Sequence, residues 1–271
     1  SKQDCNPDVV GCDIYDVRVN MNEIQHNAYA RNLDLANIDC ESPLARAAKQ
    51  MNILRGICAA PANYTSLLDN NYNNKTWNIL DLIADQLELG EQVIHIAART
   101  AQNDEIENRL NIAGISTARI DSTVSNHSAQ ASLFKSKQAQ VMLMGIKCAQ
   151  AYSFSQCSNL IIGSLEWSYG SFQQALGRAY RLNSKKHINC HVVLHRDSIE
   201  ELLYDKVAQK RDAATLCLHG EPVDVADTED SRDALANHIT QYDGHSESYD
   251  NEETIERKWG EQRERLALAA V

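Results

Sequence analysis

The sequence predicts an α/β protein built on a doubly wound parallel sheet that is flanked by helices. Four short apolar runs are the first observation, at residues 92–97, 141–144, 160–162 and 191–194, and a weaker fifth covers residues 117–120. The four runs are nearly continuous rather than alternating, which is typical of strands buried on both faces of a parallel sheet. Helical segments separate the runs, at residues 101–113, 127–137 and 172–182. This order of strands and helices favours right-handed crossovers within one sheet.

The segment that precedes the sheet is predicted to be mainly helical. Its helical stretches cover residues 23–35, 43–57 and 77–89. A polar, Asn-rich connector lies between the second and third stretches, at residues 62–74. We therefore expect a helical linker region at residues 1–74 and the sheet domain at residues 75–218.

Two capping patterns indicate helix starts in the second half of the chain. Ser171-x-x-Gln174 has the form of a capping box before the helix at 172–182, and Asp197-x-x-Glu200 opens a helix at 199–216. Residues 219–271 form an acidic tail, which we expect to be partly disordered up to residue 251. Residues 252–270 regain a helical composition, and this helix is expected to dock either on the domain or on a partner.

Composition excludes several classes of protein. The chain has 271 residues, of which 43% are hydrophobic and 23% charged, as in a globular protein with a substantial core. No apolar run approaches 18 residues and no signal-peptide pattern opens the chain, so we expect no membrane association and an intracellular location. Scattered cysteines such as Cys148, Cys157 and Cys190 suit buried, reduced thiols. Cys5 and Cys12 lack a second Cys/His pair at finger-like spacing, so we predict no metal site.

The net charge of −11 is distributed unevenly along the chain. Residues 220–271 contain 14 acidic and five basic side chains, so this segment carries −9. Residues 90–219 contain 14 basic and 11 acidic side chains, so the middle of the chain carries +3. This mild surplus of positive charge is compatible with phosphate contacts but does not establish them.

The most informative motif is Gln-Ala-Leu-Gly-Arg-Ala-Tyr-Arg at residues 174–181. Gln174, Arg178 and Arg181 are spaced i, i+4 and i+7, which places them on one face of a helix. Two guanidiniums on one face form a rigid set of donors that a triphosphate can satisfy. The alternative is a surface helix with two solvated arginines.

Polar and charged side chains also follow three of the predicted strands. Arg99 and Thr100 come after the first strand, Lys147 after the strand at 141–144, and Glu166 and Trp167 after the strand at 160–162. The carboxyl ends of parallel strands meet at one edge, where ligand sites of such sheets lie. A hydroxyl beside an arginine, and a lysine nearby, suit nucleic-acid phosphates. Alternatively, Thr100 only caps a helix and Lys147 is only solvated.

Over residues 17–211 the chain resembles the C-terminal, RecA-like lobe (the helicase C domain) of Swi/Snf-type ATPases of helicase superfamily two. The similar pieces are Gln25 and Tyr29, the Leu54-Arg55-Gly56-Ile57-Cys58-x-x-Pro61 signature, Lys75, Phe134, the strand leading to Lys147, Trp167 with the 174–181 motif, and Ser198-Ile199-Glu200-Glu201. There are also departures from the family pattern. Ser122 follows Asp121 where the family has glycine, residues 148–154 contain no glycine, and Leu182-Asn183-Ser184 replaces Ile-Gly-Gln.

The resemblance implies ATP with Mg²⁺ as cofactor, bound mainly by an N-terminal RecA-like lobe. Arg181 then corresponds to an arginine finger, Arg178 to the γ-phosphate contact, and Gln174 and Gly177 to further nucleotide contacts. Arg99, Thr100, Lys147 and Trp167 correspond to nucleic-acid contacts, and DNA is the expected nucleic acid. The chain lacks a Gly-x-x-x-x-Gly-Lys-Ser/Thr loop and an Asp-Glu-x-His segment, so we do not expect it to hydrolyse ATP alone.

Two alternatives to a motor lobe remain open at this point. The first is a degenerate lobe that acts as a nucleic-acid clamp or assembly module, which the missing glycines and the acidic tail favour. The second is an ordinary nucleotide-binding enzyme, which is weaker because the first strand is not followed by Gly-x-Gly-x-x-Gly. We expect the chain to be part of a longer protein, or else a separately encoded lobe.

Overall fold

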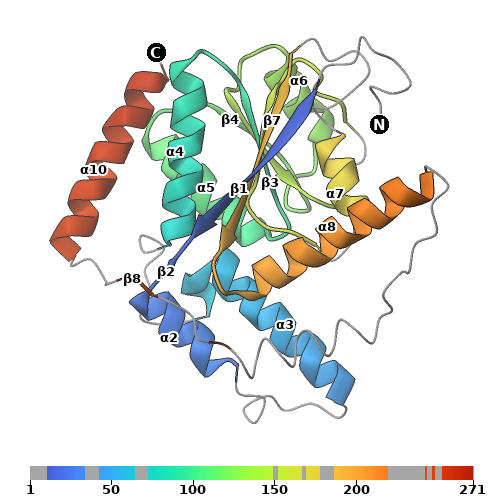
Figure 1. The fold of residues 1–271 in the computed structure, drawn as a ribbon. Coiled ribbons are helices and arrows are strands. Elements are labelled where there is room, and N and C mark those ends of the chain that lie inside the picture. The colour runs from blue at the N-terminus through green and yellow to red at the C-terminus, as the bar shows by residue number, and fades with distance from the viewer. Residues whose placement is uncertain are drawn as a thin grey trace.

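The structure, a computed structural model, describes residues 11–33, 43–64, 73–148, 152–166, 169–177, 186–218, 242, 246–247 and 252–270. Its centre is a six-stranded sheet in the order β1-β7-β6-β3-β5-β4, and every pair of neighbouring strands is parallel. Helices cover both faces of the sheet (Figure 1). The predicted doubly wound α/β fold is therefore confirmed.

The five predicted strands are present with small changes in length. They are β3 (Val93–Ala97), β4 (Thr117–Ile120), β5 (Val141–Gly145), β6 (Asn159–Ile162) and β7 (Ile188–His195). The three strands in the middle of the order, β6, β3 and β5, have nearly every residue buried. This burial on both faces explains why their sequences are continuously apolar.

A sixth strand, β1 (Cys12–Val19), comes from the segment expected to be helical. It pairs in parallel with β7 from Cys12 opposite Ile188 to Val19 opposite His195. Exposed and partly buried residues alternate along most of β1, as in a strand at the edge of a sheet. A search for continuous apolar runs does not detect such a strand, because only one of its faces is buried.

The remaining elements surround this sheet. They are β2 (Met21–Asn22), α2 (Glu23–Arg31), α3 (Pro43–Ala59), η2 (Pro61–Asn63), α4 (Asn74–Glu88), α5 (Thr100–Ile112), α6 (His127–Lys135), α7 (Tyr169–Leu176), α8 (Ile199–Leu218), β8 (Ser246–Glu247) and α10 (Glu252–Ala269). None of the helices in the described ranges is long and apolar enough to span a membrane.

The core consists of three clusters. One lies on the face of the sheet covered by α6, α7 and α8 and includes Ile94, Phe134 and Met142. A second lies on the opposite face, between the sheet and the helices α4, α5 and α10, and includes Ile79 and Leu143. The third fills the space between α2, α3 and the start of α8, below the carboxyl ends of the strands in Figure 1. The first two clusters make the sheet doubly wound, and the third attaches the helical linker segment to it.

The capping patterns of two helices differ from the prediction. The helix α8 is capped by Ser198 rather than Asp197, because the Ser198 hydroxyl accepts the amide of Glu200 (3.1 Å) and Glu201 accepts the amide of Asp197 (2.8 Å). The helix α7 begins at Tyr169, so Ser171 lies inside its first turn and is not the cap. It also ends at Leu176, where Gly177 forms a turn, consistent with the low helix propensity of glycine.

The C-terminal helix α10 docks on the domain, which is one of the two alternatives left open by the sequence. The Arg109 guanidinium of α5 packs over two indoles, 5.0 Å from the ring centre of Trp77 in α4 and 4.8 Å from that of Trp259 in α10. Gln262 donates to the Trp77 carbonyl (2.9 Å) and to Asp81 (2.8 Å). This cation–π arrangement joins three helices on one face of the sheet.

Two further contacts hold the tail before α10 begins. The short strand β8 pairs in parallel with β2. The Tyr242 ring stacks on His26 with 5.6 Å between ring centres and lies 5.2 Å from that of Tyr29. The expectation of partial disorder over residues 219–251 otherwise falls outside the described residues.

Candidate nucleic-acid and nucleotide interface

The carboxyl ends of β3, β5 and β6 bring together the predicted nucleic-acid contacts that the structure describes. Arg99 and Thr100 follow β3 directly, and Thr100 is the first residue of α5. Lys147 follows β5, and its side chain is 82% exposed. Because β3 lies between β5 and β6, all three residues lie on one edge of the sheet. Trp167 lies outside the described residues.

The predicted nucleotide contacts are described only in part. Gln174 is exposed on α7, and Gly177 forms the turn that follows this helix. Arg178 and Arg181 lie outside the described residues. The common helical face of Gln174, Arg178 and Arg181 therefore stays a prediction.

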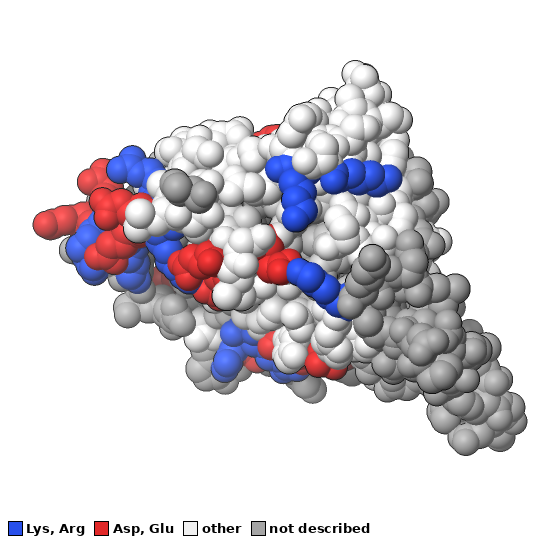
Figure 2. Space-filling view, turned by 90° about the horizontal axis from the view of Figure 1, so that it is seen from above, with Lys and Arg blue, Asp and Glu red and all other residues white. Residues whose placement is uncertain are grey.

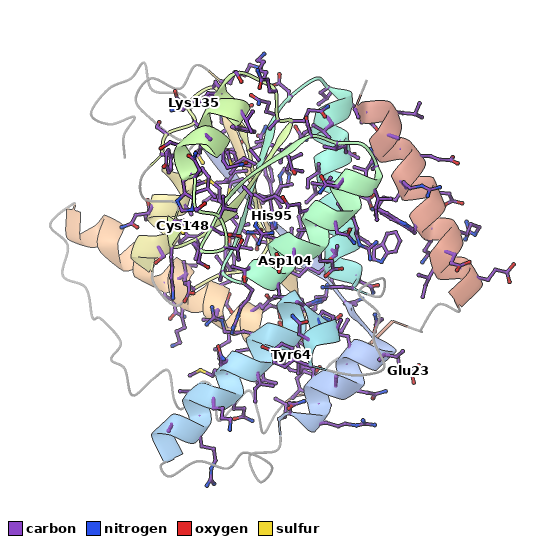
Figure 3. All side chains as sticks on the ribbon, turned by 180° about the vertical axis from the view of Figure 1, so that it is seen from behind. Glu23, Tyr64, His95, Asp104, Lys135 and Cys148 are labelled. Carbon is purple, nitrogen blue, oxygen red and sulfur yellow. The ribbon has the colours of Figure 1, made fainter. Side chains whose placement is uncertain are left out.

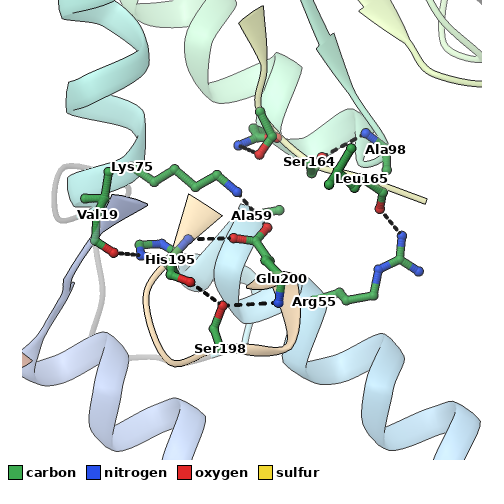
Figure 4. Close-up of polar contacts among 12 residues, drawn as sticks. Val19, Arg55, Ala59, Lys75, Ala98, Ser164, Leu165, His195, Ser198 and Glu200 are labelled. Atoms are coloured by element: carbon green, nitrogen blue, oxygen red, sulfur yellow. Dashed lines mark hydrogen bonds and ion pairs between the residues drawn. The ribbon is translucent and has the colours of Figure 1, made fainter. Parts of the chain in front are cut away.

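The helix α3 crosses this edge and contacts two strand ends. Arg99 donates from Nη2 to the Asn52 carbonyl (2.9 Å) and to Asn52 Oδ1 (2.5 Å). One turn along α3, Arg55 donates to the carbonyl of Leu165, which follows β6 (2.6 Å; Figure 4). A fourth hydrogen bond, from the Ala98 amide to Ser164 Oγ (2.8 Å), joins the ends of β3 and β6 directly. The strand ends and α3 thus form one connected rim.

Three cations and one carboxylate lie along this rim. Glu166 is 3.6 Å from Arg55 and 4.0 Å from Lys147. Burial lowers the pKa of Arg55; the Glu166 carboxylate opposes this shift and the nearby Arg99 adds to it. Positive charge therefore exceeds negative charge among these four residues, which suits an anionic ligand.

A buried ion pair lies beneath the rim, where α2, α3 and α8 meet β7. Lys75 and Glu200 are both buried, and the distance from Lys75 Nζ to Glu200 Oε1 is 2.6 Å (Figure 4). The second carboxylate oxygen of Glu200 accepts the amide of His195 (3.1 Å). Ser198 completes the group, since its hydroxyl donates to the His195 carbonyl (2.7 Å). Both charges are thus neutralised inside the protein, as buried ionic groups require.

The same group connects α2 and α3 to the sheet. Gln25 donates to the Ile57 carbonyl (2.9 Å) and lies 3.1 Å from Nε2 of His195. His195 Nδ1 lies 3.3 Å from the Val19 carbonyl, so a neutral imidazole protonated on Nδ1 fits both contacts. The Tyr29 hydroxyl accepts the amide of Ile199 at the start of α8 (2.7 Å). Residues from four separate parts of the sequence therefore meet at the end of β7.

A second buried polar chain runs from β3 to β4. His95 Nδ1 lies 3.1 Å from Asn103 Oδ1, Asn103 donates to Asp121 (3.4 Å), and Arg119 Nε donates to the same carboxylate (2.7 Å). His95 lies in the interior of the sheet domain in Figure 3. Gly163 leaves room for it, since a Cβ atom there would lie 2.4 Å from His95 Nε2. The Asp121 carboxylate therefore accepts hydrogen bonds from side chains inside the protein.

Comparison with solved structures identifies this arrangement of elements. The C-terminal part of the Fun30 ATPase domain aligns with a TM-score of 0.62 and 13% identity, over 86% of this chain and 99% of that chain. The C-terminal domain of the Sulfolobus solfataricus SWI2/SNF2 ATPase aligns with a TM-score of 0.61 and 11% identity, over 85% and 99% respectively. The chain has the fold of a Swi2/Snf2 C-terminal ATPase lobe.

The chain is also similar in sequence to parts of two curated proteins. Switch 2 of Arabidopsis thaliana is 23% identical over 175 residues, which is 63% of this chain and 20% of that protein. The DNA annealing helicase and endonuclease ZRANB3 of Mus musculus is 24% identical over 100 residues, which is 36% of this chain and 9% of that protein. The matches thus span a fifth or less of these two relatives. No family model matches the chain.

The structure adds two residues that the sequence analysis does not assign to the site. Arg55 is identified there only as part of a signature, and it contacts Leu165 and Glu166 across the rim. Glu200 is identified only as part of a helix start, and it neutralises Lys75. Both contacts join residues more than 100 positions apart. A single sequence carries no signal for such a pairing.

Two buried histidines, His95 and His195, predict a loss of stability in mild acid. Burial lowers the pKa of both His95 and His195 to about 3. The unfolded chain, in which a histidine pKa is about 6.5, therefore binds more protons than the folded chain between pH 6.5 and 3. We expect the free energy of unfolding to fall by about 1.4 kcal/mol per histidine between pH 7.5 and 5.5, or about 3 kcal/mol for both.

Urea denaturation at the two pH values, followed by circular dichroism, measures this loss. His95→Gln is expected to lower stability at pH 7.5, but to remove about half of the pH dependence because one titrating group is gone. If the variant and the wild type lose equal stability between pH 7.5 and 5.5, His95 is not responsible for the acid sensitivity.

Proposed function

We propose that this chain is the C-terminal motor lobe of an ATP-dependent DNA translocase or helicase. The observation that carries the proposal is the likeness of the chain to two Swi2/Snf2 C-terminal ATPase domains, each covered over 99% of its length. The basic rim at the carboxyl edge supports it, because ligand sites of open parallel sheets lie at this edge. The relative ZRANB3, named as a DNA annealing helicase, favours DNA as the nucleic acid. An intracellular location, in the nucleus or nucleoid, belongs to the same proposal.

In this proposal ATP and Mg²⁺ bind between this lobe and an N-terminal RecA-like lobe, which holds most of the nucleotide. Arg181 acts as the arginine finger, and Arg178 contacts the γ-phosphate. Gln174, exposed at the end of α7, contributes a polar contact, and Gly177 provides the turn before the two arginines. A guanidinium can supply two parallel hydrogen bonds to phosphate oxygens, which supports this assignment. ATP supplies the bond whose hydrolysis drives closing and opening of the two lobes.

The rim residues contact the nucleic-acid backbone in this proposal. Lys147 is mostly exposed, so its ammonium is accessible to a phosphate from solvent. Arg99 is held in place by Asn52, so its remaining guanidinium donors have a fixed direction. Thr100 adds a hydroxyl at the first turn of α5, where a helix terminus favours anions. Trp167 is assigned to the same interface from the resemblance alone.

Binding of duplex DNA by the 271-residue chain tests the nucleic-acid part of this proposal. We expect the double variant Arg99→Gln/Lys147→Gln to weaken binding about tenfold or more at low salt. We also expect it to reduce the slope of log Kd against log salt by about 1.8, because two phosphate contacts are lost. Fluorescence anisotropy with a labelled 30-base-pair duplex at four salt concentrations measures both quantities.

A control with the same change in charge comes from the opposite edge of the sheet. Lys135 and Lys137 are exposed at and after the end of α6, and Asn tolerates the positive φ of Lys137. Figure 2 views the molecule from this side and shows a mostly uncharged surface with a few separate Lys and Arg side chains, while charges of both signs gather at its left end. Lys135→Gln/Lys137→Asn should leave binding nearly unchanged. Equal losses in the two double variants would mean that the rim is not the nucleic-acid interface.

A further inference from the structure

Glu166 lies between two cations of the basic rim. It is 3.6 Å from Arg55 on α3 and 4.0 Å from Lys147 after β5. The side chains of Arg55 and Glu166 are 13% and 23% exposed, whereas that of Lys147 is 82% exposed. The Glu166 carboxylate therefore lies near both the mostly buried guanidinium of Arg55 and the exposed ammonium of Lys147.

Arg55 keeps its position independently of Glu166. Its Nη2 atom donates to the Leu165 carbonyl at 2.6 Å, and its neighbours Leu54, Ile57 and Cys58 are fully buried. The guanidinium is enclosed by the rim and lies near the positive charge of Arg99. A partly desolvated cation in this position requires an anion nearby. Among the described residues, Glu166 is the carboxylate in ion-pair contact with it.

The contact between Glu166 and Lys147 is weak by comparison. Its N–O distance of 4.0 Å is at the outer limit for an ion pair, and Lys147 is mostly in solvent. Exposed pairs of this kind contribute little to stability and are screened by salt. An incoming anion can therefore replace Glu166 at Lys147 at little cost, and can then reach the donors of Arg55.

We propose that Glu166 occupies, in the free lobe, the place of a DNA phosphate between Arg55 and Lys147, and that DNA displaces it from these cations. This inference rests on the proposed function. It makes Arg55 a further phosphate-binding residue beside Arg99 and Lys147. It makes Glu166 a specificity-determining residue that offsets part of the charge of Arg55 and Lys147 until a ligand with closely spaced negative charges arrives. A neutral or singly charged ligand gains less from displacing it.

Replacing the carboxylate with an amide tests this inference. We expect Glu166→Gln in the 271-residue chain to bind the 30-base-pair duplex at least about threefold more tightly at low salt, because the internal competitor is removed. The slope of log Kd against log salt should steepen by about 0.9 for each cation that becomes available to DNA. Thermal unfolding of the same samples should show that the fold is intact.

A double-mutant cycle separates competition from a general effect of charge. If Glu166 competes for the two cations, its replacement gains much less affinity in a Lys147→Gln background, and less again in an Arg55→Gln/Lys147→Gln background. The matched control is Glu91→Gln, which removes a carboxylate paired with Lys186 at the opposite edge of the sheet. This control should leave DNA binding unchanged.

The outcomes distinguish this inference from the proposed function. If the wild-type chain does not bind the duplex, or prefers an RNA duplex of the same sequence, the proposed function in DNA translocation fails. If the chain binds DNA through Arg99 and Lys147 but Glu166→Gln gains no affinity, only the inference fails. An equal gain in the presence and absence of Lys147 and Arg55, or an equal gain from Glu91→Gln, also overturns it.

Discussion

Replacing Glu200 with Gln is expected to lower the free energy of unfolding by about 3–5 kcal/mol. Lys75 would then be a fully buried cation without a counter-charge, since Glu200 lies 2.6 Å from it. The amide of His195 would also lose its carboxylate acceptor. Urea denaturation monitored by circular dichroism measures the loss. The effect is large because the cost arises from an uncompensated charge rather than from one lost hydrogen bond.

Neighbouring variants separate this effect from a general effect of replacing an acidic residue. Glu201 lies next in the sequence and pairs with the exposed Arg18 at 3.0 Å, so Glu201→Gln should cost no more than about 1 kcal/mol. The double variant Lys75→Met/Glu200→Gln removes both charges and should be more stable than Glu200→Gln alone. A double variant no more stable than the single one would mean that the ion pair is not the source of the cost.

Replacing Arg181 with Ala, in a protein that contains both lobes, is expected to lower ATP turnover by about a thousandfold or more. An arginine finger stabilises charge that develops in the transition state, which accounts for an effect of this size. Nucleotide affinity should change by only a few-fold, because in the proposed function the other lobe holds most of the ATP. A coupled ATPase assay and binding of a fluorescent nucleotide measure the two quantities separately.

The control for this variant is Lys186→Ala. Lys186 is a basic residue five positions after Arg181 in the sequence, and it pairs with Glu91 on the protein surface, so its removal should leave turnover unchanged. Retention of most ATPase activity by Arg181→Ala, and by an Arg178→Ala/Arg181→Ala double variant, would contradict the role of an arginine finger. That result would instead favour the alternative of a non-catalytic nucleic-acid clamp.

The fold was largely predictable because most of its strands are buried on both faces. Val93–Ala97 and Val141–Gly145 lie inside the sheet with helices on either side, and their continuous apolar sequences reflect this position. The edge strand Cys12–Val19 was not predictable in the same way. Its Asp13, Tyr15 and Asp16 are exposed, so the local pattern resembles that of a loop. The strand becomes recognisable only from its parallel pairing with β7 in the structure.

The candidate site was predictable to the extent that topology determines it. Arg99 and Lys147 follow parallel strands, so their common edge could be inferred before their contacts were known. The pairings of Arg55 with Glu166 and of Lys75 with Glu200 could not be inferred from the sequence, because each joins distant segments of the chain. The sequence places Glu166 beside the candidate nucleic-acid site, but its distances from Arg55 and Lys147 come only from the structure.

The docked helix α10 determines how the acidic segment before it is attached to the domain. Trp259 covers Arg109, and Leu266 is fully buried against the α4 and α5 side of the sheet, so the last helix is an integral part of the fold. Residues 219–251 are therefore tethered at both ends, by α8 and by α10, and do not form a free terminus. Loop-closure entropy depends only weakly on length, so the part of this segment before Tyr242 can differ in length at little cost. A chain cut before Glu252 would instead leave a guanidinium and an indole uncovered on its surface.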